Sequence, residues 1–397
     1  MFSSRVKVGV FVLEGLNALA TTLYFTYLFF NMRDRFGFSN LQNLALAATS
    51  GLVYTVGVWY AGQFAQRRGY FLALKLGFSV MGVAMLLGSS LRTVPGQYAA
   101  MILWTLGMCF TWPCLEAITS ERESPTRLKR LLGIYNVVWS TGGGVATFVG
   151  GAVLEHLGAA SIYLVPATLH AIQVALVIGL ERSHRGRPAP TAAAPGGPLL
   201  AETEARRSPV SPRAFLLMAW VANPFAYVAM NAVIPVIPGL AHKFALTPAQ
   251  AGVFASVWLL ARAAGFLLLW QWTRWHYRFR WLLGAYLAMA GGFATILLGG
   301  NLWLLVAAQV GFGIAVALIY YSSLYYSMDV GETKGEHGGF HEAAIGAGIF
   351  GGPAVGAASL YFFPAQPNMN AWAVTALLMV GLAWLVRLRR GGARRGR

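Results

Sequence analysis

Long apolar stretches alternate with short polar segments along the whole chain of 397 residues. A helix needs about 20 mostly apolar residues to cross the hydrocarbon core of a bilayer. Stretches of this length recur along the chain, and we predict twelve membrane-spanning helices. Their expected ranges are 8–30, 41–62, 71–91, 97–119, 131–155, 160–181, 213–240, 249–272, 281–300, 302–327, 340–363 and 370–388. Pro224, Pro235 and Pro238 predict kinks in the seventh stretch.

The composition is typical of a chain that faces lipid. Charged residues make up 11% of the chain and hydrophobic residues 57%, whereas a soluble domain carries about 25% charged residues. The two cysteines, Cys109 and Cys114, are too few for a disulfide framework and lack metal-ligand spacing. The first stretch is too long for a cleavable signal. We therefore predict an all-α membrane protein without a metal or a cofactor.

Basic residues fall mainly on one side of the predicted membrane. Of the 30 Lys and Arg residues, 25 lie on the side of the two termini and four on the opposite side, while Arg262 lies within the eighth stretch. Cytoplasmic loops are enriched in Lys and Arg, so both termini are expected in the cytoplasm, at a bacterial inner membrane. Despite the net charge of +17, this pattern favours membrane lipids over nucleic acid as partners. We expect a monomer.

Residues 182–212 are rich in proline and alanine and cannot bury a core. They divide the chain near its midpoint. We predict that they form a flexible cytoplasmic linker between an N-terminal six-helix bundle, 1–181, and a C-terminal six-helix bundle, 213–397, with a basic tail.

The two halves share residues at a nearly constant separation. Asn17 matches Asn223, Gly142 matches Gly348 and Gly150 matches Gly356, each about 206 positions apart, and Ser39 and Gln42 match Thr247 and Gln250 at about 208. Transporters are often built from such internal repeats. The pattern therefore indicates an ancient duplication.

The segment after the second stretch reads Gly62-Gln-Phe-Ala-Gln66-Arg67-Arg68-Gly69. It resembles the Gly-x-x-x-Asp-Arg-x-Gly signature of the major facilitator superfamily, with Gly62, Arg67 and Gly69 in three of its positions. Gln66 replaces the acid, and the corresponding segment 270–280 keeps basic residues but not the glycines. The resemblance implies two six-helix bundles related by a pseudo-twofold axis, alternating access to a central site, and a gate at this segment.

Acidic and histidine residues around the start of the eleventh stretch are the second part of the expected gate. They are candidates to pair with Arg67 across the halves or to take part in proton coupling, and the alternative is a solvated loop. These residues are Glu332, Glu336, His341 and Glu342. The His341-Glu342 pair also resembles the start of a zinc-protease motif, but the second histidine is absent, and zinc is not expected.

Glycines recur in the fifth and eleventh stretches at intervals that favour close helix packing. The resemblance implies that these helices also slide during alternation. Residues 346–351 match Gly-x-Gly-x-x-Gly, but no strand precedes them, so dinucleotide binding is not expected. The packing candidates are Gly142, Gly150, Gly348, Gly352 and Gly356.

Ionisable groups inside apolar stretches are the strongest functional candidates, because each costs about 2.5–3.5 kcal/mol at a helix centre. Glu14 and Asn17 share one face of the first helix, and Glu116 lies in the fourth stretch. Burial favours the protonated form of a carboxyl group, so both glutamates are candidates to exchange a proton. The alternative for Glu14 is a structural carboxylate.

Arg262 is a candidate to hold an anionic substrate or a coupling carboxylate, and a structural ion pair is the alternative. The other candidates for a substrate or proton site are polar or aromatic residues within the stretches. They are Trp112, Asn136, Trp139, Asn223, Asn231 and Gln309. Aromatic side chains are numerous around them, which favours an amphipathic substrate over a sugar.

These observations predict a secondary active transporter for a small molecule and not an enzyme. The chain has no Gly-x-x-x-x-Gly-Lys-Ser/Thr loop for ATP, so an ion gradient is the expected energy source. The leading hypothesis is a proton-coupled antiporter that exports amphipathic compounds. The alternatives are uptake of a small metabolite or organic anion and, in a different class, a lipid-modifying membrane enzyme with its site at 329–342.

Overall fold

The computed structural model describes residues 2, 4–121, 123, 125–185, 210–330 and 334–394, and these residues form helices joined by short turns. Twelve helical segments within them are long and apolar enough to cross a membrane, which confirms the predicted fold class. The elements are α1 (Ser4–Phe36), α2 (Asn40–Arg68), α3 (Tyr70–Ser90), α4 (Val94–Met108), α5 (Trp112–Ser120), α6 (Pro125–Leu157), α7 (Ser161–Arg185), α9 (Pro212–Val233), η1 (Ile234–Val236), α10 (Ile237–Lys243), α11 (Pro248–Gln271), α12 (Phe279–Leu298), α13 (Leu302–Val330), α14 (Lys334–Phe362) and α15 (Met369–Arg394). The predicted linker falls mostly at 186–209, outside the described residues.

Two of the twelve spans are broken near prolines. The expected kink in the seventh span occurs at Pro235, which lies in the 3₁₀ turn between α9 and α10, whereas Pro224 is accommodated inside α9. The fourth span divides into α4 and α5, a break that we did not predict. Pro113 is in the first turn of α5. It has no N–H to donate, and its ring clashes with the carbonyl of the residue four positions earlier, so the helix is interrupted before Trp112.

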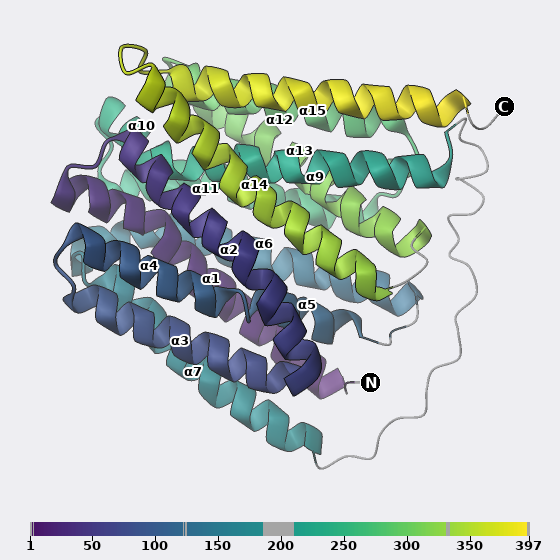
Figure 1. Cartoon of the computed structure of the whole chain (residues 1–397), viewed down its shortest axis with the longest axis horizontal. Helices are drawn as coiled ribbons and strands as arrows, with labels where there is room; N and C mark the ends of the chain where they lie inside the picture. The colour runs from purple at the N-terminus through teal and green to yellow at the C-terminus, as the bar shows by residue number, and fades with distance from the viewer. Residues whose placement is uncertain are drawn as a thin grey trace. The chain divides into compact units, whose positions relative to one another are not determined.

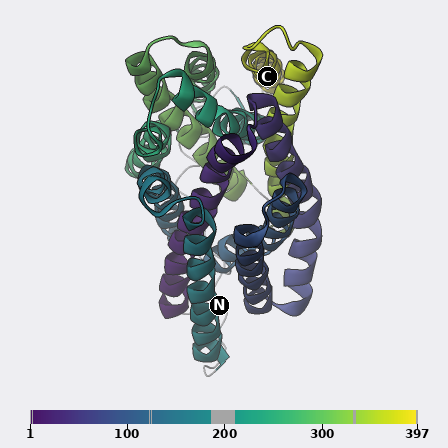
Figure 2. The same ribbon diagram turned by 90° about the vertical axis from the view of Figure 1, so that its left-hand side faces the viewer.

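The helices form two compact units. Unit 1 consists of Met1–Ser39, Thr49–Gly196 and Ile237–Ser256. Within it α1 packs against α6 and α7, and α3 lies between α4 and α7, as Figure 1 shows. Unit 2 consists of Asn40–Ala48, Gly197–Val236 and Val257–Arg397. There α9 contacts α12, α13, α14 and α15, and Figures 1 and 2 show α14 and α15 side by side.

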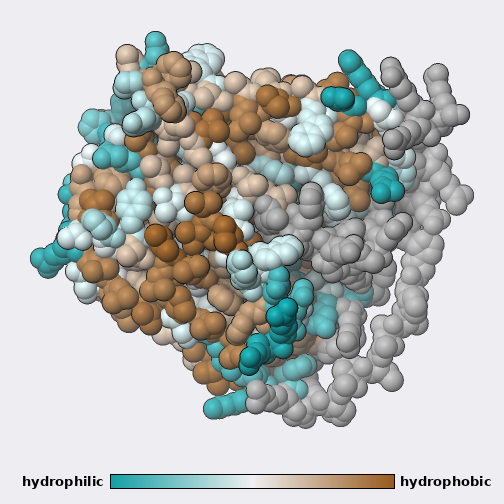
Figure 3. Space-filling model, in the orientation of Figure 1, coloured by the Kyte–Doolittle hydropathy of each residue, from teal (hydrophilic) through white to brown (hydrophobic). Residues whose placement is uncertain are grey.

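The outward faces of the helices are apolar. Figure 3 shows hydrophobic side chains over much of the visible surface and hydrophilic side chains mainly towards helix ends. Large apolar residues such as Val56, Leu86, Leu268 and Val380 are more than half exposed. Leaving such residues in water is unfavourable, so this surface suits the hydrocarbon of a bilayer.

Backbone conformation repeats between the two halves. Gly37 and Gly69 have φ values of +68° and +94°, and the residues 208 positions later, Ala245 and Tyr277, have φ values of +50° and +51°. This separation equals that of Ser39 and Thr247. Positive φ values therefore occur at equivalent positions, although in the second half they fall on residues that carry a Cβ atom.

Candidate functional site

The middle of α1 places two polar side chains inside unit 1. Glu14 and Asn17 are both 0% exposed. Their helix lies close to α6 because Gly142 has no side chain. A Cβ atom at Gly142 would lie 3.0 Å from both the Ala18 Cβ atom and the Gly15 carbonyl oxygen. This close packing surrounds Glu14 and Asn17 with neighbouring helices and leaves them no access to solvent.

Glu14 approaches polar groups of α5 and α6 without a well-formed hydrogen bond. Its carboxylate lies near the Tyr135 hydroxyl and near the half-buried Glu116 carboxylate. Among the described residues, neither Glu14 oxygen has a well-formed hydrogen bond, and the side-chain amide of Asn17 has no partner for its nitrogen or its oxygen. Buried polar groups are normally hydrogen-bonded. A set of unsatisfied groups of this kind marks a candidate site for a ligand or a proton.

The two tryptophans predicted for the site extend it along α5 and α6. Trp112 and Glu116 share one face of α5, at i and i+4. The Trp112 and Trp139 rings pack edge to face with centroids 5.9 Å apart. Trp139 donates a hydrogen bond from Nε1 to Asn136 Oδ1 at 3.1 Å, while Asn136 Nδ2 has no partner among the residues that the structure describes. The six candidates of unit 1 thus lie on neighbouring positions of α1, α5 and α6 and form one candidate site.

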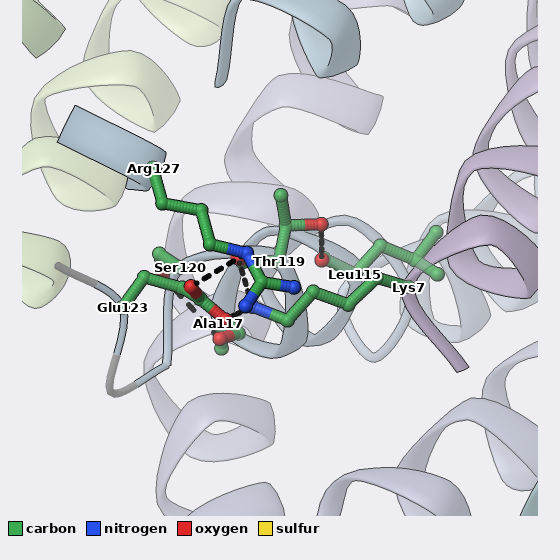
Figure 4. A network of polar contacts seen from close by, with 7 residues as sticks. All are labelled: Lys7, Leu115, Ala117, Thr119, Ser120, Glu123 and Arg127. Atoms are coloured by element: carbon green, nitrogen blue, oxygen red, sulfur yellow. Dashed lines mark hydrogen bonds and ion pairs between the residues drawn. The ribbon is translucent and has the colours of Figure 1, made fainter. Parts of the chain in front are cut away.

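A second polar cluster lies where α1 begins and α5 ends, as Figure 4 shows. Lys7 forms an ion pair with Glu123 and donates a hydrogen bond to the Thr119 carbonyl at 2.9 Å. Arg127 Nε lies 3.2 Å from the second Glu123 oxygen. Both Lys7 and Glu123 are buried. Sequence reasoning missed this cluster, and the only local signal was the i,i+4 spacing of Glu123 and Arg127.

Arg262 is the main charged candidate in unit 2. It is 5% exposed, its guanidinium carbon lies 5.1 Å from the centre of the Trp258 ring, and Nη1 contacts the Met230 sulfur at 3.4 Å. The Tyr227 and Tyr320 side chains lie close enough to interact with it electrostatically. Cation–π contact is a common environment for a buried guanidinium. Arg262 therefore lies in an aromatic setting formed by α9, α11 and α13.

The three amide side chains predicted for unit 2 differ in whether they have hydrogen-bond partners. Asn223 is 1% exposed and Gln309 is 2% exposed. Within the described part of the chain, neither side-chain amide atom of Asn223 has a hydrogen-bond partner, and Gln309 Nε2 also has none. Asn231 is half-buried and donates to the Tyr227 carbonyl of its own helix at 2.9 Å. Asn223 and Gln309 are thus the stronger ligand candidates of the three.

The predicted gate residues are only partly described. Gly62 is half-buried, Arg67 and Gly69 are exposed, and Gly69 has a positive φ of +94° immediately before α3. Glu332 lies outside the described residues, and so do the side chains of Glu336, His341 and Glu342. The pairing proposed for Arg67 stays a prediction. In the described part of the chain, no three His, Cys, Asp or Glu side chains are grouped to hold a metal ion.

The predicted packing glycines lie at close helix contacts. A Cβ atom at Gly150 would clash with the Tyr27 ring of α1. Cβ atoms at Gly348 and Gly352 would clash with the α9 backbone at Pro224 and Val228. Gly356 faces Leu44 of α2 and Asn370 of α15. Whether these helices slide against each other stays a prediction.

Twelve apolar spans that enclose isolated polar side chains define a polytopic membrane protein of the carrier type. Residues 10–353 match the sequence model of the Major Facilitator Superfamily. The chain therefore belongs to this superfamily of membrane transporters, as its gate motif suggested.

Solved structures of transporters resemble the chain over nearly its whole length. The nucleoside transporter NupG has a TM-score of 0.67 at 14% identity and covers 97% of this chain and 98% of its own. The human organic anion transporter MFSD10 has a TM-score of 0.63 at 16% identity and covers 96% and 99%. These identities establish a shared fold alone.

One group of curated relatives matches a smaller part of the chain. Probable quinate permeases of two Aspergillus fumigatus strains are 28% identical over 137 residues. The match covers 32% of this chain and 25% of each permease. The chain therefore aligns with about a quarter of the length of these relatives.

Proposed function

We propose that this transporter couples the export of small amphipathic molecules to proton movement, with Glu14 as the proton-carrying group and Glu116 as its neighbour. The observation that carries the proposal is the Glu14 carboxyl group, which is 0% exposed within a span and has no well-formed hydrogen bond to either oxygen among the described residues. Proton uptake removes the charge that an apolar interior disfavours. A conformational change that alternately hydrates and buries Glu14 would therefore transfer a proton.

The surroundings of Glu14 support an amphipathic substrate. The edge-to-face pair Trp112–Trp139 offers apolar area, and Asn17 and Asn136 offer unsatisfied amide groups. Ligand sites commonly combine aromatic walls with a few polar groups that fix orientation. A planar molecule with one polar or charged end fits this combination, whereas a sugar would need more hydrogen-bonding groups.

Reconstitution tests the proposal directly. The full chain is placed in liposomes that contain a pH-sensitive dye, and ethidium serves as the amphipathic probe. An imposed pH gradient should drive ethidium movement, and an ethidium gradient should change the internal pH. Glu14→Gln should reduce both signals to those of empty liposomes. The matched control is Glu181→Gln, which changes a carboxylate of unit 1 that pairs with Lys75 at 2.8 Å. Coupled movement that survives in Glu14→Gln would refute the assigned role.

A second candidate function is the transport of an organic anion. Arg262, buried against Trp258 and near two tyrosines, is a suitable partner for a carboxylate, because hydrogen bonds to charged groups are among the stronger ones. The human organic anion transporter and the two probable quinate permeases, which are similar to this chain, carry names that fit this reading.

Uptake of fluorescein by the same liposomes would distinguish the two candidates. If an anion binds at Arg262, Arg262→Gln should lower fluorescein uptake by about tenfold, the usual effect of losing one charged hydrogen bond. Arg280→Gln removes an exposed arginine and should leave uptake unchanged. Equal uptake by the wild-type protein and Arg262→Gln would exclude this role.

The proposed setting is a bacterial inner membrane, with both termini in the cytoplasm and the chain acting as a monomer. The asymmetry of the basic residues supports the orientation. Reporter fusions at the two termini and at residue 200 test it. An active periplasmic reporter at any of these points would reverse the topology.

A further inference from the structure

The loop between α11 and α12 folds its aromatic side chains inward. Trp275, His276 and Tyr277 are 1%, 5% and 4% exposed, while the flanking Arg274 and Arg278 are exposed. Tyr277 has a φ of +51°, in the left-handed region that disfavours residues with a Cβ atom. A bulky residue with this conformation is a genuine exception, and neighbouring contacts must hold it there.

The equivalent bend in the first half needs no such support. Gly69 lies 208 positions earlier and has a φ of +94°, and a Cβ atom built on it would meet no atom within 4 Å. Glycine adopts this region about as readily as any other. A positive φ is therefore relaxed at Gly69 and strained at Tyr277.

Two hydrogen bonds to one helix hold Tyr277 in place. Its backbone N–H donates to the Tyr326 hydroxyl at 2.9 Å, and its own hydroxyl donates to the Asp329 carboxylate. Burial and the adjacent Asp329 raise the pKa of the Tyr277 hydroxyl above its ordinary value, so the hydroxyl remains a donor. The Tyr277 ring also packs against Tyr326, with centroids 5.0 Å apart, and against Phe215 at 5.4 Å.

We propose that Tyr277 is a strained latch that ties the α11–α12 loop to the C-terminal end of α13 through Tyr326 and Asp329. In the closed state the two hydrogen bonds offset the unfavourable backbone conformation. When they break, Tyr277 returns to a negative φ and the loop leaves α13. Such an element has two discrete arrangements, which is what a conformational switch requires.

The latch acts on a helix that also reaches the candidate site of unit 2. Tyr320, which lies near Arg262, is six residues before Tyr326 on α13, about 9 Å along the axis. Ring contacts connect these points. Phe266 packs against Tyr320 and Tyr321, and Trp275 packs against Tyr321 and Tyr326, with centroids 5.7 and 6.1 Å apart. Opening the latch would therefore free the end of the helix that carries Tyr320.

Limited trypsin digestion of the full chain in detergent measures latch opening without a substrate. Cleavage after Arg274 and Arg278, identified by mass spectrometry, requires the loop to leave α13. Tyr277→Phe and Asp329→Asn should each raise the initial cleavage rate at these two sites by about tenfold, the usual effect of losing a hydrogen bond to a charged group. Tyr286→Phe is the matched control, because it removes another buried tyrosine hydroxyl, which donates to the Leu378 carbonyl at 2.9 Å. A rate for Tyr277→Phe equal to that of Tyr286→Phe would overturn the latch.

A second pair of variants isolates the backbone strain. Tyr277→Gly and Tyr277→Ala both delete the ring and the hydroxyl, but only glycine accepts a positive φ without cost. The glycine variant should therefore have the higher Tm, although glycine in place of alanine normally lowers stability. A lower Tm for Tyr277→Gly than for Tyr277→Ala would show that the left-handed conformation is not maintained, and the proposal would fail even if both variants fold.

Discussion

Two sets of buried polar side chains on α1 differ in their hydrogen bonding. Between residues 14 and 24, Glu14, Asn17 and the Tyr24 hydroxyl have no hydrogen-bond partner among the described side chains, whereas Thr21 donates to the Asn17 carbonyl of its own helix. Towards its ends the polar groups are paired. Lys7 binds Glu123 and the Thr119 carbonyl, Tyr27 donates to the Thr147 carbonyl at 2.5 Å, and Asn31 donates to the Tyr163 hydroxyl at 3.0 Å.

This difference separates structural groups from functional ones. A paired group contributes to the stability of the fold, whereas a buried group without a partner costs free energy. Unsatisfied polar groups that persist in a packed interior require an explanation such as a ligand, a water molecule or a catalytic role. The middle of α1 is therefore the part of the helix for which function is the best explanation.

The largest difference in the free energy of unfolding is expected between substitutions of two buried glutamates. Glu123→Leu removes the partner of the buried Lys7, and breaking a buried ion pair in this way costs about 3–5 kcal/mol. Glu14→Leu removes a carboxylate that has no partner, so it should leave the free energy of unfolding unchanged or raise it. Unfolding of each variant by sodium dodecyl sulfate in mixed micelles, followed by circular dichroism, measures the difference.

A double variant provides the control for the ion pair. Lys7→Met combined with Glu123→Leu removes both charges, and replacing a whole buried pair with apolar residues is often neutral. The double variant should therefore regain most of the stability that Glu123→Leu loses. If it were as unstable as the single variant, Glu123 would act through packing, and the comparison with Glu14 would lose its meaning.

An intermediate contrast is expected for two asparagines of α1. Asn31→Leu deletes the donor to Tyr163 and should destabilise the fold by about 1 kcal/mol. Asn17→Leu deletes an amide whose nitrogen and oxygen are both unsatisfied, so it should be neutral or stabilising. The same unfolding measurement applies. A loss for Asn17→Leu as large as that for Asn31→Leu would mean that Asn17 has a partner in the membrane.

The sequence predicts the spans and the polar candidates because both depend on local properties. Hydropathy over about 20 residues identifies a helix that can cross a bilayer, and an ionisable residue such as Glu14 or Arg262 is conspicuous within it. The boundaries are less accurate. Helix α1 runs from Ser4 to Phe36, well beyond the apolar stretch, because polar residues continue the helix outside the hydrocarbon.

Pairing between distant residues is what the sequence could not provide. Lys7 and Glu123 are separated by 116 positions, and Tyr277 and Asp329 by 52. Nothing in either local sequence indicates its partner, because the contact depends on tertiary packing. The positive φ of Tyr277 is equally hidden, since tyrosine does not favour that region. Only the alignment with Gly69 in the first half would have pointed to it.

The smallest expected contrast is between two tyrosines one turn apart on α1. Tyr27→Phe removes the hydrogen bond to the Thr147 carbonyl and should lower the free energy of unfolding by about 0.5–1.5 kcal/mol. Tyr24→Phe removes a buried hydroxyl without a partner, so it should leave stability unchanged or raise it. Both substitutions keep the ring, so packing is the same in each. A lower free energy of unfolding for Tyr24→Phe would mean that the Tyr24 hydroxyl has a hydrogen-bond partner. The region of unsatisfied polar groups would then end closer to Asn17, which lies seven residues before Tyr24.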